Sequence, residues 1–226
     1  MAHQYEIEIK CLLGSKQAAD ALKQKMRALD PKIRLVSSGS QLNHYFIGQP
    51  LASLPPAVAH LIDSPHMRAL EEISAHAKDF SLRTRDADGT TLLVIKASVD
   101  DTSSANGIAR REFEIAIPHL SIHALDKILL DAGYAYQSKW SRTREEYEFQ
   151  HARVTIDKNA GYGYVAEFEK IVDDPAKAQT AKEELRQIIN NLDLEELPQD
   201  RLERMFTHYN SHWPEYYGTE KVFHLA

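Results

Sequence analysis

The chain has 226 residues, of which 33 are acidic and 27 are lysine or arginine, and its formal net charge is −6. This length accommodates one domain with a substantial core or two small ones, and the acidic balance excludes a global positive field, so no nucleic-acid partner is expected. Cys11 is the only cysteine, which excludes an intramolecular disulfide framework and fits a reducing compartment.

The sequence lacks the features of a secreted or membrane-inserted chain. Its N-terminus enters a charged, strand-like segment without the basic, apolar and small-residue succession of a signal peptide. No apolar run approaches membrane-spanning length. We therefore expect a soluble cytoplasmic protein with no membrane partner, in which Cys11 is a packed residue and not a nucleophile.

The first predicted strand covers residues 5–10. Side chains of an extended chain alternate between two faces, which places Glu6, Glu8 and Lys10 on one side and apolar residues on the other. The apolar side is expected to meet a core. Neighbouring carboxylates repel each other unless a cation lies between them, so the charged side is a candidate site for water, metal or ligand.

The next elements are a helix, two strands and an insertion. Ser15 is a suitable N-cap for a helix to about residue 29, with its apolar stripe at Ala18, Ala21, Leu22, Met26 and Leu29. Strands are predicted at 33–36 and 41–47. Residues 48–78 contain four prolines and two short helical patterns. This insertion could be a lid, a partner-binding element or extra packing, and the sequence does not choose among them.

The remaining elements are mostly strands. Asp88-Gly89 predicts a hairpin, and Gly133 a helix stop. Strands are predicted at 80–85, 91–98, 108–117, 136–149, 153–157 and 164–171, and helices at 121–132, 174–190 and from 198 onward. Without parallel βαβ cycles or a phosphate-binding glycine loop, this order indicates an α+β fold whose antiparallel strands curve into a barrel or tunnel.

Charges recur at alternate positions on these later strands. The basic positions are Arg83, Arg85, Lys96, Arg110, Arg142 and Arg144, and the acidic ones are Glu112, Glu114, Asp157, Glu167 and Glu169. Any one such strand is more often a solvated face with cross-strand pairs than a ligand site. Agreement among several strands favours a charged interior.

Together these segments resemble the CYTH superfamily, the triphosphate tunnel metalloenzymes. The resemblance covers residues 5–170 and depends on the order of the charged segments, from Glu6-Ile7-Glu8-Ile9-Lys10 to Gly161-Tyr162-Gly163-Tyr164-Val165-Ala166-Glu167-Phe168-Glu169. Asn43 departs from the pattern, because the family usually carries an acidic residue there. The resemblance implies an eight-stranded antiparallel β-barrel tunnel with flanking helices. We expect a single domain over 1–226, with an inserted helical segment at 48–78 and a C-terminal helix plus aromatic tail at 198–226.

The resemblance also implies roles for the charged residues. Metal would be held by Glu6, Glu8, Glu112, Glu114, Asp157, Glu167 and Glu169, and phosphate oxygens by Lys10, Arg83, Arg85, Lys96, Arg110, Arg142 and Arg144. The residues implied to act directly in catalysis are Glu6, Glu8, Lys10, Glu167 and Glu169. A further basic residue from the final helix would be Arg201, Arg204 or Lys221.

Three functions are compatible with this charge pattern. The leading one is hydrolysis of a small-molecule triphosphate, inorganic or organic, with Mg2+ or Mn2+, the hard ions that carboxylates and phosphates prefer. The second is an adenylate cyclase of the CyaB-like class IV type, which makes cyclic AMP and pyrophosphate from ATP. The third is a binding module for triphosphates or nucleotides without catalysis. A homodimer is left open.

Overall fold

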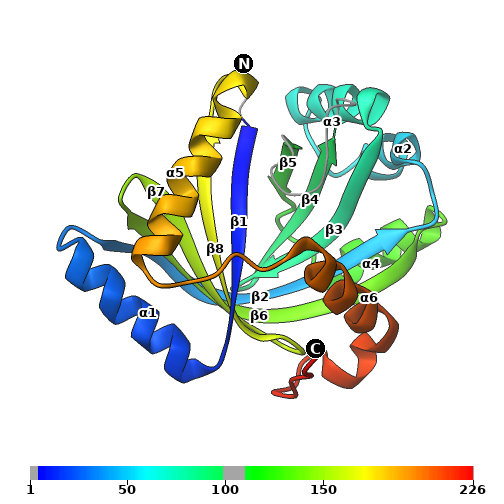
Figure 1. The fold of residues 1–226 in the computed structure, drawn as a ribbon. Helices are drawn as coiled ribbons and strands as arrows, with labels where there is room; N and C mark the ends of the chain where they lie inside the picture. Colours follow the sequence, from blue (N-terminus) through cyan, green and yellow to red (C-terminus); the bar gives the residue numbers. More distant parts are fainter. Residues whose placement is uncertain (1–4, 99–109, 226) are drawn as a thin grey trace. The chain divides into compact units, whose positions relative to one another are not determined.

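The computed structural model describes residues 5–98 and 110–225 (Figure 1). The chain separates into two compact units. Of the described residues, unit 1 comprises 5–40 and 141–225, and unit 2 comprises 41–98 and 110–140. The assignment of one domain over the whole chain stays a prediction.

In the part of the chain that the structure describes, eight strands form one sheet, which confirms the predicted eight-stranded antiparallel α+β class. The strands are β1 (Tyr5–Gly14), β2 (Arg34–Ile47), β3 (Asp79–Ala87), β4 (Thr90–Ser98), β5 (Arg110–Ala116), β6 (Ala135–Phe149), β7 (Ala152–Asn159) and β8 (Gly163–Val172). Their order is β1-β8-β7-β6-β2-β3-β4-β5. Among the described residues, β1 and β5 are the first and last strands of this order. Residues 100–109 of the predicted loop and strand lie outside the described residues.

The prediction of two separate strands at 33–36 and 41–47 was wrong, because residues 34–36 and 41–47 belong to the single strand β2. It runs without a break from Arg34 to Ile47, through Ser37-Ser38-Gly39-Ser40. Small polar residues have weak strand preference, so the pattern indicated a connection there. Pairing within the sheet overrides that preference.

Unit 1 has its core on the apolar side of β1, β6, β7 and β8. Helices α1 (Lys16–Leu29) and α5 (Ala178–Asn191), the latter after a short 3₁₀ turn at Pro175–Lys177, pack on β1 and β8 (Figure 1). The Ser15 hydroxyl accepts from the Ala18 backbone N–H at 3.2 Å, which confirms the predicted cap. The buried stripe of α1 is Ala19, Leu22 and Met26, so the predicted burial of Ala21 and Leu29, both exposed, was wrong.

Unit 2 has its core on the apolar side of β3, β4 and β5. It is covered by α2 (Leu54–Val58), which follows a 3₁₀ turn at Leu51–Ser53, and by α3 (Ser64–His76) and α4 (Ile122–Asp131). Leu54, Val58, Leu70 and Ile73 of the insertion are buried in this core. The segment predicted as a helical insertion therefore contributes packing to unit 2. Both Asp88 and Gly89 have positive φ, as the predicted hairpin requires.

The C-terminal part of unit 1 wraps back onto the β7–β8 turn. Helix α6 (Gln199–Tyr216) continues through Pro214, and the following segment forms a parallel bridge between Val222 and Gly161. At Gly161, φ is +85°, and a Cβ would lie 2.6 Å from the Tyr209 ring. Only glycine fits this close approach. The predicted aromatic tail therefore packs on the turn that joins two charged strands.

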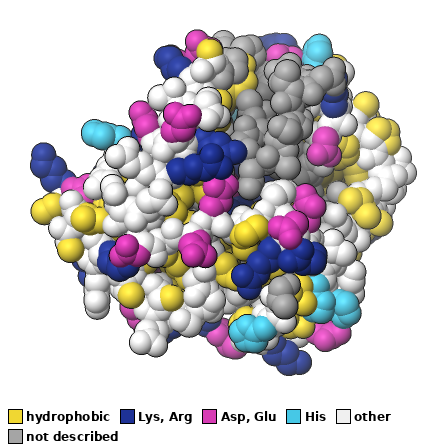
Figure 2. All heavy atoms as spheres, viewed as in Figure 1, with side chains coloured by type: hydrophobic (Ala, Val, Ile, Leu, Met, Phe, Trp, Pro, Cys, Tyr) yellow, Lys and Arg dark blue, Asp and Glu magenta, His cyan; other side chains and the backbone are white. Residues whose placement is uncertain are grey.

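The surface carries charges of both signs. On the face seen in Figure 2, lysine and arginine side chains lie next to aspartate and glutamate, without a continuous field of one sign. None of the helices in the described part of the chain is both long enough and apolar enough to span a membrane.

Candidate functional site

In unit 1, the pairing of β1, β8 and β7 places charged residues next to one another on one face of the sheet. Lys10 of β1 pairs with Glu167 of β8, and Glu8 pairs with Glu169. On the other side of β8, Glu167 pairs with Thr155 of β7. Because paired residues project on the same face of a sheet, these side chains gather on one surface while Ile7, Ile9 and Phe168 enter the core.

Glu167 is the centre of an ion-pair network on this face. Lys10 Nζ lies 2.9 Å from Glu167 Oε1 and also contacts Glu8, and Arg144 Nη2 donates to Glu167 Oε2 at 2.7 Å. Burial alone would raise the pKa of the Glu167 carboxyl. The charges of Lys10, Arg144 and Arg142 outweigh burial and hold that pKa well below its usual range. Glu167 is therefore a carboxylate at neutral pH.

Asp157 orients two of the predicted phosphate-binding arginines. It is buried on β7, where Arg144 Nε donates to its Oδ1 at 2.7 Å. Arg142 Nη1 and Arg144 Nη2 donate to its Oδ2 at 2.9 and 2.6 Å. This geometry places both arginines on the same face as Lys10 and Glu167. Burial opposes the charge of Arg144, but Glu167 and Asp157 outweigh it and raise the pKa of the guanidinium.

Unit 2 has its own charged face. Arg85 Nη1 donates to Glu114 Oε2 at 2.9 Å, and Arg85 Nε donates to Asn43 Oδ1 at 2.8 Å. Lys96 Nζ lies 3.4 Å from Glu112 Oε2, its register partner on β5. The structure thus brings together four predicted residues from β3, β4 and β5.

Arg83 differs from the other cations of this face. It is only 8% exposed, and its Nη1 donates to the hydroxyl of Tyr45 at 3.0 Å. Its guanidinium carbon lies 5.2 Å from the centre of the Tyr45 ring. Over residues 5–98 and 110–225, no carboxylate forms an ion pair with Arg83, and its buried Nε has no hydrogen-bond acceptor. A nearby anion would offset the desolvation of a buried guanidinium of this kind, and no carboxylate of the described residues supplies one.

The last two predicted residues are placed only in part. Glu6 is half-buried on β1, where it pairs in register with Ile171. Arg110 begins β5 opposite Ser98, and its side chain lies outside the described residues. The roles of all the predicted site residues stay predictions.

The sequence of this chain matches a known protein family. The model of the CYTH domain matches residues 4–201. The chain belongs to the CYTH family. By sequence, no protein with a curated description matches the chain.

Several solved structures share the CYTH fold of this chain. The Pyrococcus horikoshii protein PH1819 is 22% identical with a TM-score of 0.59, covering 88% of this chain and 99% of that one. A candidate adenylate cyclase of Vibrio parahaemolyticus is 15% identical with a TM-score of 0.57, covering 88% and 98%. HpAC1 of Hippeastrum, a candidate adenylyl cyclase with a dominant triphosphatase activity, is 17% identical with a TM-score of 0.50, covering 90% and 96%. At these identities the similarity establishes the fold.

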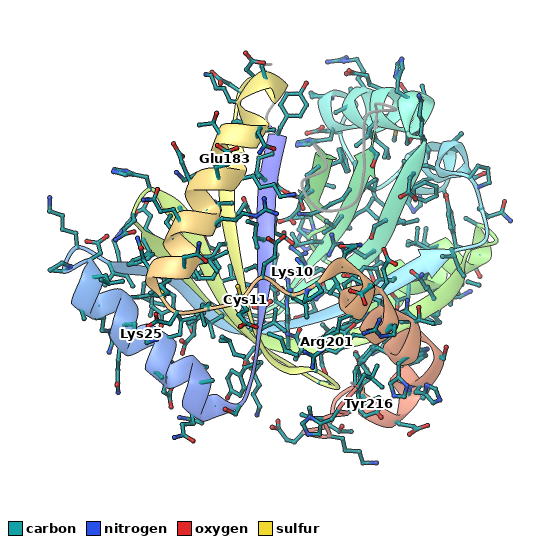
Figure 3. The ribbon with its side chains drawn as sticks, in the orientation of Figure 1. Lys10, Cys11, Lys25, Glu183, Arg201 and Tyr216 are labelled. Atoms are coloured by element: carbon teal, nitrogen blue, oxygen red, sulfur yellow. The ribbon has the colours of Figure 1, made fainter. Side chains whose placement is uncertain are left out.

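Among the three basic residues considered near the end of the CYTH chain, Arg201 has the most distinctive surroundings. It lies in the first turn of α6, shortly after Leu197, whose N–H donates to the Lys10 carbonyl at 2.7 Å (Figure 3). Its Nη2 donates to the Leu225 carbonyl at 3.3 Å, and its Nε is buried without an acceptor in the described part of the chain. Arg204 instead pairs with Asp200 at 2.7 Å, and Lys221 is exposed. Arg201 therefore has donors left for an anion.

The carboxylates suit a hard metal ion by chemistry, because they are oxygen donors without paired cysteine or histidine ligands. In unit 1 the carboxylates of Glu8 and Glu167 form ion pairs with basic side chains of the protein. Lys10 contacts both carboxylates, and Arg144 contacts Glu167. Within 5–98 and 110–225, no group of three or more His, Cys, Asp and Glu residues is positioned to hold a metal ion. Metal binding at Glu8 and Glu167 would require Lys10 to move away from them.

Two pairs of residues that contact the charged faces were assigned no role from the sequence. Asn43 and Tyr45 of β2 contact the two arginines of β3. Arg153 of β7 lies 3.1 Å from Glu146 and 3.7 Å from Glu169. The sequence did contain one signal for these residues. Arg153 is four positions from Asp157 and Glu146 is two from Arg144, so each lies on the same face of its strand as a predicted site residue.

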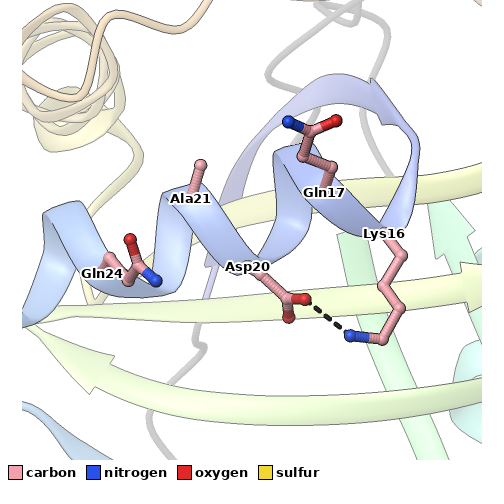
Figure 4. Close-up of a pocket in the computed structure, with 5 residues that line it drawn as sticks. All are labelled: Lys16, Gln17, Asp20, Ala21 and Gln24. Carbon is pink, nitrogen blue, oxygen red and sulfur yellow. Dashed lines mark hydrogen bonds and ion pairs between the residues drawn. The ribbon is translucent and has the colours of Figure 1, made fainter.

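Features away from the charged faces have simpler explanations. Burial, and then Glu196, raise the pKa of the Cys11 thiol to about 12, which agrees with a packed residue and not a nucleophile. A surface hollow along α1 is lined by Lys16, Gln17, Asp20, Ala21 and Gln24 (Figure 4). The Lys16–Asp20 ion pair of 2.6 Å within it is typical of a solvated helix face.

Proposed function

We propose that this CYTH protein hydrolyses a triphosphate with the help of Mg2+ or Mn2+. The observation that supports this best is Arg83, a buried guanidinium without a carboxylate partner among the described residues. Arginine matches phosphate oxygens through its planar fork of donors. A polyanionic substrate would supply the negative charge that the described residues do not place beside Arg83.

The predicted site residues divide into two roles in this proposal. Glu6, Glu8, Glu112, Glu114, Asp157, Glu167 and Glu169 are proposed to hold the metal directly or to orient its ligands, and Lys10, Arg83, Arg85, Lys96, Arg110, Arg142 and Arg144 to bind phosphate oxygens. When bound, a divalent ion neutralises phosphate charge and makes a water molecule more acidic. The arginines stabilise the charge that develops on the departing diphosphate. Asp157 keeps Arg142 and Arg144 in place for that task.

Adenylate cyclase activity is the second candidate, because the Vibrio parahaemolyticus protein with this fold is a candidate adenylate cyclase. HpAC1, however, combines such a description with a dominant triphosphatase activity. The same cations would serve both reactions, since both develop negative charge on a leaving polyphosphate. Hydrolysis remains the proposal because it requires only a triphosphate and water.

The test is a panel of tripolyphosphate, thiamine triphosphate and ATP, each with Mg2+ or Mn2+, followed by chromatography of the products. The proposal predicts release of one phosphate and a diphosphate product from at least one substrate, and loss of this release when the metal is chelated. Cyclic AMP with pyrophosphate as the main products from ATP would favour the cyclase. Tight binding without turnover under every condition would favour a binding module.

A further inference from the structure

Two residues of β2 contact the arginine pair of β3. In the antiparallel register Asn43 pairs with Arg85, and Tyr45 pairs with Arg83. Paired residues share a face, so these four side chains lie together, while His44 and Thr84 between them point to the opposite side. Strand β2 thus supplies one contact for each guanidinium.

Both contacts use neutral oxygen atoms. Asn43, 2% exposed, accepts from Arg85 Nε at 2.8 Å through its amide oxygen. The Tyr45 hydroxyl accepts from Arg83 Nη1 at 3.0 Å, and its ring faces the same guanidinium. A neutral acceptor restricts the orientation of an arginine without cancelling its charge. A carboxylate at position 43 would form an ion pair with Arg85 in addition to the one with Glu114.

The strand pair that carries these residues is fixed from its other side by one buried carboxylate. Asp126 of α4 lies 2.6 Å from His44 Nδ1 through its Oδ2, and its Oδ1 accepts from the Thr84 hydroxyl at 2.6 Å. The Tyr136 hydroxyl donates to the same carboxylate at 2.7 Å. His44 and Thr84 are the residues that separate Asn43 from Tyr45 and Arg83 from Arg85. The two β-strands are therefore held at the very positions between the contacts that orient the arginines.

We infer that Asn43 and Tyr45 are positioning residues for triphosphate binding, which hold Arg85 and Arg83 through neutral acceptors so that both guanidinium groups are oriented in advance without a further negative charge beside them. This inference rests on the proposed function, because it assumes that the arginines bind the triphosphate. The inference states specifically that the affinity for triphosphate depends on a neutral side chain at position 43.

The principal test is Asn43→Asp, which keeps the shape of the side chain and adds one negative charge beside Arg85. Calorimetric titration with tripolyphosphate should show Kd raised about tenfold or more, because a new charge within the site acts at low effective dielectric. The loss should shrink as salt is raised from about 0.05 to about 0.5 M, since salt screens charge. A purely structural defect would not depend on salt in this way. Asn190→Asp, the same change at an exposed position of α5, is the matched control and should leave Kd unchanged.

The second test is Tyr45→Phe, which removes the acceptor of Arg83 and keeps the ring. Kd should rise about threefold, as expected for the loss of one hydrogen bond that fixes a ligand group. Because this change adds no charge, its effect should be independent of salt. Tyr45→Phe also keeps the inference testable if Asn43→Asp does not fold.

Arg83→Ala separates the inference from the proposed function. If Arg83→Ala binds tripolyphosphate as the unchanged protein does, the proposed triphosphate site is wrong. If Arg83→Ala abolishes binding while Asn43→Asp and Tyr45→Phe bind normally, the proposed site stands and the positioning role is overturned. Normal thermal unfolding of each variant shows that the comparison concerns the site and not the fold.

Discussion

Replacing Glu167 by glutamine removes the charge at the centre of the unit 1 network and keeps the size of the side chain. Breaking a buried ion pair by removing one partner typically costs about 3–5 kcal/mol. The ion pairs of Glu167 are only partly buried, and without Glu167 Lys10 still pairs with Glu8 and Arg144 with Asp157, so we expect the smaller loss of about 2–3 kcal/mol. For a chain of this size, that is a fall in Tm of roughly 5–10 °C. Glu167→Gln should also reduce metal-dependent triphosphate turnover about a hundredfold or more.

The stabilising effect of Glu167 depends on pH. The pKa of Glu167 is depressed in the folded protein, so its stabilising contribution is present above the ordinary glutamate value of about 4.3 and is lost as the pH falls through the folded pKa. Urea unfolding of the two proteins should therefore show a constant difference near neutral pH. That difference should close in acid, because only the unchanged protein takes up the proton.

Glu148→Gln is the matched control for this experiment. Glu148 pairs with Arg34 at 2.7 Å on the surface, where the two side chains are 62% and 66% exposed. Surface pairs contribute about 0–1 kcal/mol, so this variant should unfold and turn over substrate nearly as the unchanged protein does. A stability difference for Glu167→Gln that persists unchanged into acid, or full metal-dependent turnover, would refute the reasoning about Glu167.

Three further predictions concern a buried carboxylate, a glycine turn and the buried cysteine. Asp126→Asn should cost about 3 kcal/mol in urea unfolding, because the amide nitrogen cannot accept the hydrogen bonds that His44, Thr84 and Tyr136 provide; a cost below about 1 kcal/mol would contradict the role of Asp126. Gly161→Ala should lower Tm by several degrees more than Gly218→Ala, because both glycines have positive φ but only the former meets the Tyr209 ring; equal losses would exclude that contact as the cause. Cys11 should resist thiol labelling in the folded protein up to alkaline pH and react in urea, since burial raises its pKa to about 12; rapid labelling without urea would show the thiol to be accessible.

The charged faces could be predicted from the sequence because strand periodicity is simple. Alternation at Glu6, Glu8 and Lys10 requires one face once the segment is a strand, and the structure pairs Glu8 with Glu169 and Lys10 with Glu167. The helix cap at Ser15 and the hairpin at Asp88-Gly89 could also be predicted, because a cap and a tight hairpin depend only on neighbouring residues.

Contacts between residues far apart in the sequence could not be predicted from such local patterns. His44 and Asp126 are 82 residues apart, and nothing in their spacing indicates a buried pair. The choice of Arg201 over Arg204 depends on which side of α6 faces the tail, and that requires the position of Leu225. The continuity of β2 depends on its partners in the sheet and not on its own residues. Long-range packing and pairing decided each of these features.

The most direct test of the account is a crystal structure of the protein with a non-hydrolysable triphosphate analogue and Mn2+. The account predicts phosphate oxygens within hydrogen-bonding distance of Arg83, Arg85 and Arg144, and an anomalous Mn2+ signal on carboxylates of β1 and β8. An analogue bound away from these side chains, with Arg83 still lacking an anionic partner, would contradict it.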